Sequence, residues 1–182
     1  MKKYLNGKLE VTTGDITRET TDAIVNAANS GLMGGGGVDG AIHRVGGSSI
    51  LDECKKIRNK DYPDGLPAGQ AVITTAGNLP AQYVIHIVGP VWHGGTSDEE
   101  TTLAAAYTNS LLTAAEYDLS SISFPAISTG VYGYPKEKAA RTAFNAIDNF
   151  LQQHDKPHLV RLVFFSSADE KTFCKAVDSL EE

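Results

Sequence analysis

Apolar residues along the chain gather in short runs that predict strands. Most of these runs are rich in β-branched residues, and Gly, Pro or polar residues bound each of them, as is typical of strands. Six segments have this composition, and they are residues 9–13, 23–25, 71–75, 83–88, 122–127 and 159–165. The sequence therefore predicts a sheet of about six strands.

Apolar residues spaced three and four apart predict amphipathic helices between these strands. Leu103 to Ala115, Ala139 to Leu151 and Phe173 to Leu180 each present one apolar face. Residues 59–69, rich in Asp, Pro and Gly, are expected to form a surface loop. Strands that alternate with helices favour an α/β fold in which helices cover both faces of one sheet.

Composition narrows the class of protein. A chain of 182 residues, 41% of them hydrophobic, fits one domain over residues 1–182. A formal net charge of −6 argues against charge-driven binding to nucleic acid or to an anionic membrane surface. No apolar run approaches the roughly 18 residues of a membrane span. Two distant cysteines, Cys54 and Cys174, do not form a disulfide framework, which favours a reducing, cytoplasmic compartment.

Two glycine-rich loops are the candidate chemistry. In the first, the strand ending near Asn26 is followed by four consecutive glycines, residues 34–37, and then by a short helix. In the second, residues 128–135 follow a strand and lead into the helix that begins near Pro135. Glycine lets the backbone approach a ligand closely, and a helix N-terminus offers free N–H groups to an anion.

One such loop alone is more often a structural turn than a binding site. Two in one small domain indicate a ligand with two phosphates, or one phosphate group held from both sides. Neither loop continues as Gly-Lys-Ser/Thr, and neither has the spacing of a dinucleotide fingerprint. From the residues alone, the function is the binding of a phosphorylated, nucleotide-like ligand between the loops.

Several longer motifs carry a resemblance to a known family. They are Gly14-Asp15-Ile16-Thr17, residues 23–29 continued by residues 40–44, residues 67–71, residues 83–92 and residues 128–135. In this order, and over nearly the whole chain, they resemble the macrodomain family, MacroD-type branch. The resemblance implies a three-layer α/β/α fold with a central mixed sheet of about six strands and a cleft for ADP-ribose.

The resemblance also implies an activity. A member of this branch is a hydrolase that cleaves the ester bond at the proximal ribose of ADP-ribose, either in O-acetyl-ADP-ribose or in mono-ADP-ribosylated Asp and Glu side chains. It implies no metal and no cofactor, and the five histidines are scattered in the sequence. We expect a monomer that acts in the cytoplasm, with nucleic acid as a partner only through an ADP-ribosylated end. The alternatives are a non-catalytic reader of ADP-ribose and a domain for another nucleotide.

By this resemblance Asn29 and Asp39 are catalytic. Asn29 orients the proximal ribose hydroxyls, and Asp39 either positions or deprotonates a hydroxyl or a water. The alternative for Asp39 is that it only caps the helix that follows. His86 is interpreted as a satisfied core histidine, and His43 is given no role.

The remaining implied residues bind the ligand. Asp15 accepts a hydrogen bond from the adenine amine, or else it caps a helix after Gly14, or both. Asn26 either contacts the ligand or satisfies backbone groups of its loop. The full implied set is Asp15, Ile16, Asn26, Gly35, Gly36, Gly37, Val38, Ser128, Thr129, Gly130, Val131 and Tyr132.

The sequence departs from the family pattern at the adenine end. Many relatives have an aromatic residue that stacks on adenine after the last strand, and Ala168 is assigned to that position. Phe165 is the alternative for this contact, although its offset in the alignment is wrong. Leu66 and Ala68 replace the usual Cys and Thr before Gly69, and these changes are expected to be structural.

Overall fold

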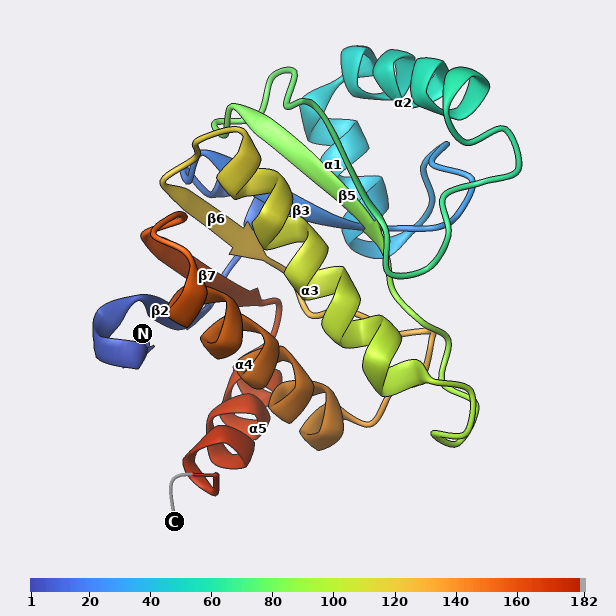
Figure 1. Ribbon diagram of the computed structural model, residues 1–182. Helices are drawn as coiled ribbons and strands as arrows, with labels where there is room; N and C mark the ends of the chain where they lie inside the picture. Colours follow the sequence, from blue (N-terminus) through green and yellow to red (C-terminus); the bar gives the residue numbers. More distant parts are fainter. Residues whose placement is uncertain (181–182) are drawn as a thin grey trace.

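The computed structural model describes residues 1–180, which form one seven-stranded sheet with helices on both faces (Figure 1). The strand order is β1-β2-β7-β6-β3-β5-β4. The edge strands β1 and β4 run antiparallel to their neighbours, and the five strands between them are parallel. The strands are β1 (Lys2–Tyr4), β2 (Leu9–Thr13), β3 (Ala23–Ala28), β4 (Ala71–Thr75), β5 (Tyr83–Val88), β6 (Ser121–Phe124) and β7 (Leu159–Phe164).

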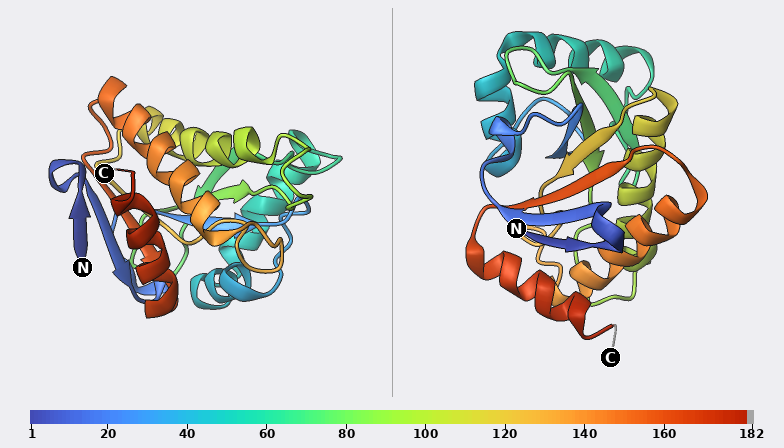
Figure 2. Two further views of the ribbon diagram at one scale, coloured as in Figure 1. Left: turned by 90° about the horizontal axis from the view of Figure 1, so that it is seen from below. Right: turned by 90° about the vertical axis from the view of Figure 1, so that its left-hand side faces the viewer.

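Two layers of helices enclose this sheet, as the sequence predicts. Helices α3 (Glu99–Glu116), α4 (Lys136–Gln153) and α5 (Ser167–Asp178) pack on one face over the larger apolar core. Helices α1 (Gly37–Gly46) and α2 (Ser48–Lys60) pack on the other face over a smaller core (Figure 2). The three-layer α/β/α architecture with a mixed sheet is therefore confirmed.

The elements differ most from the prediction at four places. The sheet has one strand more than expected. This strand, β1, was missed because it is three residues long and buries only Tyr4. Strand β3 continues to Ala28, since its small residues 26–28 pair with β5. Strand β6 ends at Phe124, directly before Pro125, rather than at Ile127. Helix α2 occupies residues 48–60, where no helix was predicted.

The five parallel strands all end at one edge of the sheet. Asp15 follows β2, Asn29 follows β3, the second glycine loop follows β6, and Phe165 follows β7. Ligands of α/β proteins bind outside this edge, so the predicted site residues lie where a ligand is expected. No helix among residues 1–180 is long and apolar enough to cross a membrane.

Candidate active site at the carboxyl edge of the sheet

Asp15 lies at the end of β2 and caps a short 3-10 helix, η2 (Ile16–Arg18). Its Oδ1 accepts from the Thr17 backbone N–H at 2.9 Å and from the Thr17 hydroxyl at 2.7 Å. The hydroxyl bond is the main reason why the pKa of Asp15 is lowered. Both bonds end on Oδ1, and the residue is exposed. The cap that the sequence allowed is therefore formed, and it leaves Oδ2 for a ligand.

The first glycine loop leads from β3 into α1. The Asn29 side-chain amide donates to the Gly34 carbonyl at 3.1 Å and so holds the loop across the end of β3. Gly36 is the N-cap of α1, and a Cβ added at Gly36 or Gly37 would meet no atom within 4 Å. The N-terminus of α1 thus opens onto free space, where its N–H groups can bind an anion.

Asn29 and Asp39 meet on either side of Gly35. A Cβ added at Gly35 would lie 3.1 Å from Asp39 Oδ2 and 3.3 Å from Asn29 Nδ2. A Cβ added at Gly40 would lie only 2.5 Å from the Gly35 carbonyl oxygen. The two residues predicted to be catalytic are therefore neighbours. A side chain at position 35 would press on both of them, and position 40 has no room for one.

Asp39 is held from behind by a buried chain of side chains. It lies in the first turn of α1 but does not cap that helix, since Gly36 is the N-cap. Its Oδ1 accepts from Asn26 Nδ2 at 2.8 Å, and Asn26 Nδ2 lies 3.1 Å from His86 Nδ1. His86 Nε2 lies 2.8 Å from Thr74 Oγ1. One line of hydrogen bonds thus joins β4, β5 and β3 to α1.

The direction of this chain follows from its last member. The Thr74 hydroxyl donates to the Thr75 carbonyl at 2.9 Å, so it accepts the proton on His86 Nε2. His86 Nδ1 then accepts from Asn26, which fixes the amide with its nitrogen toward Asp39. Burial, followed by the nearby His43, lowers the pKa of His86 to about 3. The ring is therefore neutral, and it is a satisfied core histidine.

The structure places Asn26 differently from the other predicted ligand-binding residues. It has no exposed surface, so its amide lies behind Asp39 and is not accessible to a ligand. His43 Nε2 lies 3.3 Å from Asp39 Oδ1, the oxygen that accepts from Asn26. Sequence reasoning assigned no role to His43, although its position four residues after Asp39 on one helix puts both side chains on one face.

Three carbonyl groups of the second glycine loop accept hydrogen bonds from backbone N–H groups. The Gly133 N–H donates to the Gly130 carbonyl, the Tyr134 N–H to the Ser128 carbonyl and the Trp92 N–H to the Tyr132 carbonyl. These bonds leave the N–H groups of residues 129–132 for a ligand. Ser128 has a positive φ of 65°, and its buried hydroxyl has no hydrogen-bond partner among residues 1–180. A strained residue with an unsatisfied donor is typical of a binding site.

The side of the candidate site beside Asp15 is exposed. The Gly14 N–H donates to the Phe164 carbonyl at 2.8 Å. Asp15 directly follows Gly14, and Phe165 directly follows Phe164. The Phe165 side chain is 93% exposed. Ala168, the position assigned to adenine stacking, lies in the first turn of α5. Phe165 is thus the aromatic residue that the structure brings next to Asp15.

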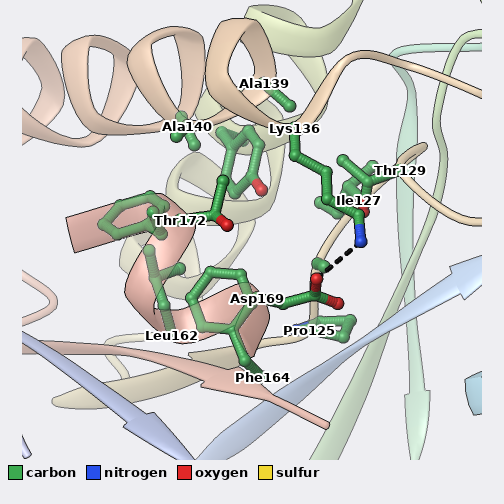
Figure 3. A pocket seen from close by; sticks show the side chains of 14 residues that line it. Pro125, Ile127, Thr129, Lys136, Ala139, Ala140, Leu162, Phe164, Asp169 and Thr172 are labelled. Carbon is green, nitrogen blue, oxygen red and sulfur yellow. Dashed lines mark hydrogen bonds and ion pairs between the residues drawn. The ribbon is translucent and has the colours of Figure 1, made fainter. Parts of the chain in front are cut away.

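A small apolar pocket lies below the second loop, between the ends of β6 and β7 and helices α4 and α5 (Figure 3). Lys136 and Asp169 form an ion pair at 2.6 Å beside it, near Thr129. Its volume of about 30 Å³ is far below that of a nucleotide site. The pocket therefore adjoins the candidate site without being its ligand-binding cleft.

Two of the five histidines, which are far apart in the sequence, come together with a cysteine in the structure. His43 on α1, Cys54 on α2 and His86 on β5 come together, and one ligand atom from each lies within 4.8 Å of the others. Cys54 Sγ lies 3.8 Å from His86 Nε2. Burial is the main reason why the pKa of the Cys54 thiol is raised to about 12, so the thiol is protonated.

Known proteins resemble this chain over nearly its full length. Residues 25–143 match the family described as Macro domain. A macro domain-containing protein of Caldanaerobacter subterraneus subsp. tengcongensis is 50% identical over 175 residues, which cover 96% of this chain and 98% of that protein. A protein of Citrobacter koseri named O-acetyl-ADP-ribose deacetylase is 51% identical over 168 residues, which cover 92% of each chain. A solved structure of the Oceanobacillus iheyensis macrodomain, a mutant with ADPR, has a TM-score of 0.93 at 45% identity and covers 100% of this chain and 98% of that one.

Proposed function

The chain belongs to the macro domain family, and from this premise we propose that it is a hydrolase that binds ADP-ribose and cleaves the ester bond at its proximal ribose. Its substrates are O-acetyl-ADP-ribose and mono-ADP-ribosylated Asp or Glu side chains. The pairing of Asn29 with Asp39 across Gly35 is the observation that carries the proposal, because binding alone requires only the glycine loops. The relative named O-acetyl-ADP-ribose deacetylase, at 51% identity, supports the same reaction.

The ligand extends along the carboxyl edge of the sheet. Asp15 Oδ2 accepts from the adenine amine beside the Ile16 backbone, and Phe165 stacks on the adenine ring. The diphosphate lies between the two loops and accepts from N–H groups of both. The loop residues that enclose it are Gly35, Gly36, Gly37 and Val38 on one side and Ser128, Thr129, Gly130, Val131 and Tyr132 on the other. The proximal ribose then reaches Asn29 and Asp39.

The reaction is the addition of water to the ester carbonyl carbon, followed by loss of the ribose oxygen. Asn26 occupies Asp39 Oδ1, so Oδ2 is the oxygen that accepts a hydrogen bond from the attacking water. Asn29 orients the ribose hydroxyls. The water supplies the hydroxyl of the released acid, and its second proton goes to the ribose oxygen that leaves. No electron transfer is involved, so we propose no cofactor. We also propose no catalytic metal, because Asn29 and Asp39 do not by themselves form a metal ligand set.

For the setting of the reaction we propose a monomeric single domain that acts in the cytoplasm. Both cysteines are free, which fits a reducing compartment. The acidic net charge of −6 disfavours broad contact with nucleic acid, so an ADP-ribosylated nucleic-acid end is the only nucleic-acid substrate that we propose.

The test is turnover combined with ligand competition. The protein is incubated with O-acetyl-ADP-ribose and with a glutamate-linked mono-ADP-ribosyl peptide, and free ADP-ribose is measured. Calorimetry with ADP-ribose, ATP and NAD measures which ligand binds best. We expect product from both substrates and preferential binding of ADP-ribose. Tight binding of ADP-ribose without product would identify a reader, and better binding of ATP or NAD would identify a domain for another nucleotide.

A further inference from the structure

The cluster of His43, Cys54 and His86 lies directly behind Asp39, and the proposed reaction does not use its thiol. The three residues come from α1, α2 and β5, which meet on the face of the sheet covered by the smaller core. We propose that this cluster binds a zinc ion and that the bound ion inhibits the hydrolase by drawing Asp39 out of its catalytic position.

The separations fit a zinc site. Zinc in proteins takes four ligands in a tetrahedron, with bonds of about 2.3 Å to sulfur and about 2.0 Å to nitrogen, so neighbouring donors stand roughly 3.3 to 3.6 Å apart. Cys54 Sγ and His86 Nε2 are already 3.8 Å apart. All three donors lie within 4.8 Å of one another. Movements of about 1 Å in the side chains would therefore bring them into coordination, and a thiolate with two imidazoles is a set that zinc prefers.

Binding changes the protonation of two ligands. Cys54 is a thiol, and it releases its proton to solvent as the zinc–sulfur bond forms. His86 Nε2 gives up its hydrogen bond to Thr74, and the ring proton moves to Nδ1. The Asn26 amide nitrogen is a donor and cannot accept from Nδ1–H, so this proton needs another acceptor. Asn26 Oδ1 is buried and has no partner among residues 1–180, and it can accept this proton when the amide turns over.

The same rearrangement removes the support of Asp39. Once the Asn26 amide has turned its oxygen toward His86 Nδ1, its nitrogen no longer donates to Asp39 Oδ1. His43 Nε2 now lies 3.3 Å from that oxygen, which is the spacing of two adjacent donors on one zinc ion. Coordination through His43 Nε2 therefore places Asp39 Oδ1 where the fourth ligand belongs. The carboxylate is then held by the metal, and it no longer faces the substrate water.

We expect the ion to enter past His43. The side chains of Cys54 and His86 are fully buried, whereas the His43 side chain is 15% exposed beside Asp39. An ion that enters the cleft meets His43 and Asp39 first and reaches the thiol last. We therefore expect bound ADP-ribose, which covers this entrance, to slow the binding of zinc.

The test compares the only two cysteines. Cys54→Ala removes one zinc ligand, and Cys174→Ala removes the half-buried thiol on α5 as a matched control. Metal-free wild type and both variants are titrated with Zn²⁺, followed by ester turnover, and with Co²⁺, followed by the near-ultraviolet absorption of a cobalt–thiolate bond. We expect one Co²⁺ per chain with this band, and loss of turnover with zinc, in wild type and Cys174→Ala. Cys54→Ala should keep its metal-free turnover and bind Zn²⁺ at least about 100-fold more weakly, because even the loss of a group that only supports a ligand costs about 10- to 100-fold.

Two results would overturn the zinc site. One is the absence of the cobalt–thiolate band in wild type, and the other is equal zinc affinity of Cys54→Ala and wild type. The inhibitory effect rests on the proposed function, whereas the cobalt titration does not. If metal-free wild type shows no turnover but binds Co²⁺ through Cys54, the hydrolase proposal fails and the metal site stands.

Discussion

The two ends of the candidate site are built differently. At the proposed ribose end, Asp39 is 5% exposed and is fixed by Asn26, which His86 and Thr74 fix in turn. At the proposed adenine end, Asp15 is exposed and its side chain is held by Thr17. One carboxylate is thus anchored through three strands of the sheet, and the other through a local turn.

This contrast matches what each end has to do. Chemistry requires an oxygen held to within about 0.5 Å of its working position, which a packed chain of hydrogen bonds supplies. Recognition of a flat adenine ring tolerates more movement, because stacking and one hydrogen bond adapt to small shifts. We therefore expect changes at the ribose end to affect turnover and stability, and changes at the adenine end to affect affinity.

Among the loop residues, the largest effect is expected at Asn29. Asn29→Ala removes both the orientation of the ribose and the bond that holds Gly34, so turnover of O-acetyl-ADP-ribose should fall about 100-fold. Asn59→Ala, an exposed position on α2, is the control and should leave turnover unchanged. Single-turnover kinetics measures the chemical step directly. If Asn29→Ala keeps more than half of the wild-type rate, Asn29 is not catalytic.

The next effect separates the packed glycine from the open one. Gly40→Ala places a methyl group against the Gly35 carbonyl, so it should destabilise the protein by about 1 to 3 kcal/mol even though Ala favours helices. Gly130→Ala points into open space, so its unfolding free energy should stay within about 0.5 kcal/mol of wild type. Urea denaturation measures both. Equal stabilities would show that the ribose end yields to an added side chain.

The buried imidazole at the ribose end should make stability depend on pH. Unfolding restores the pKa of His86 from about 3 to its ordinary 6.5, so below pH 6.5 the unfolded chain binds a proton that the folded protein does not. Stability therefore falls as the pH drops from 7 to 5, by about 2 kcal/mol from this residue alone. Urea denaturation of wild type and His86→Gln at both pH values should show this difference. The same pH slope in both proteins would mean that His86 is protonated in the folded state.

The smallest effect is expected at the adenine end. Phe165→Ala should weaken ADP-ribose binding about fivefold, because one aromatic contact contributes about 1 kcal/mol. The turnover number should not change. Ala168→Phe should leave the affinity as it is, and calorimetry measures both variants. A gain in affinity for Ala168→Phe, with no loss for Phe165→Ala, would place the stacking position on α5.

Patterns of apolar residues predicted most of the fold, because its buried strands are β-branched and its main helices are amphipathic. They missed β1, which buries a single residue, and α2, whose apolar positions Ile50, Cys54 and Ile57 stand among charged residues. Strand β3 was predicted too short, since Ala27 and Ala28 lack the β-branched side chains that mark a strand.

The residues proposed to face the ligand were predicted from motifs, whereas the residues that support them were not. Residues 26–44 hold Asn29, the glycines and Asp39 within one short segment, so their proximity follows from the sequence. The bond between Asn26 and His86 depends on the register of β3 against β5, which pairs residues 60 positions apart. The spacing of residues along the chain does not indicate that register. For the same reason, the sequence did not predict that Cys54 lies beside His86.

The division between the two ends is tested most directly by changing each carboxylate to the amide of the same shape. Asp39→Asn and Asp15→Asn are compared with wild type for the turnover number on O-acetyl-ADP-ribose and for the Kd of ADP-ribose. We predict that Asp39→Asn lowers the turnover number at least 100-fold and changes Kd only a few-fold. Asp15→Asn should raise Kd about tenfold and leave the turnover number nearly unchanged. A loss of turnover in Asp15→Asn, or full turnover in Asp39→Asn, would contradict the account.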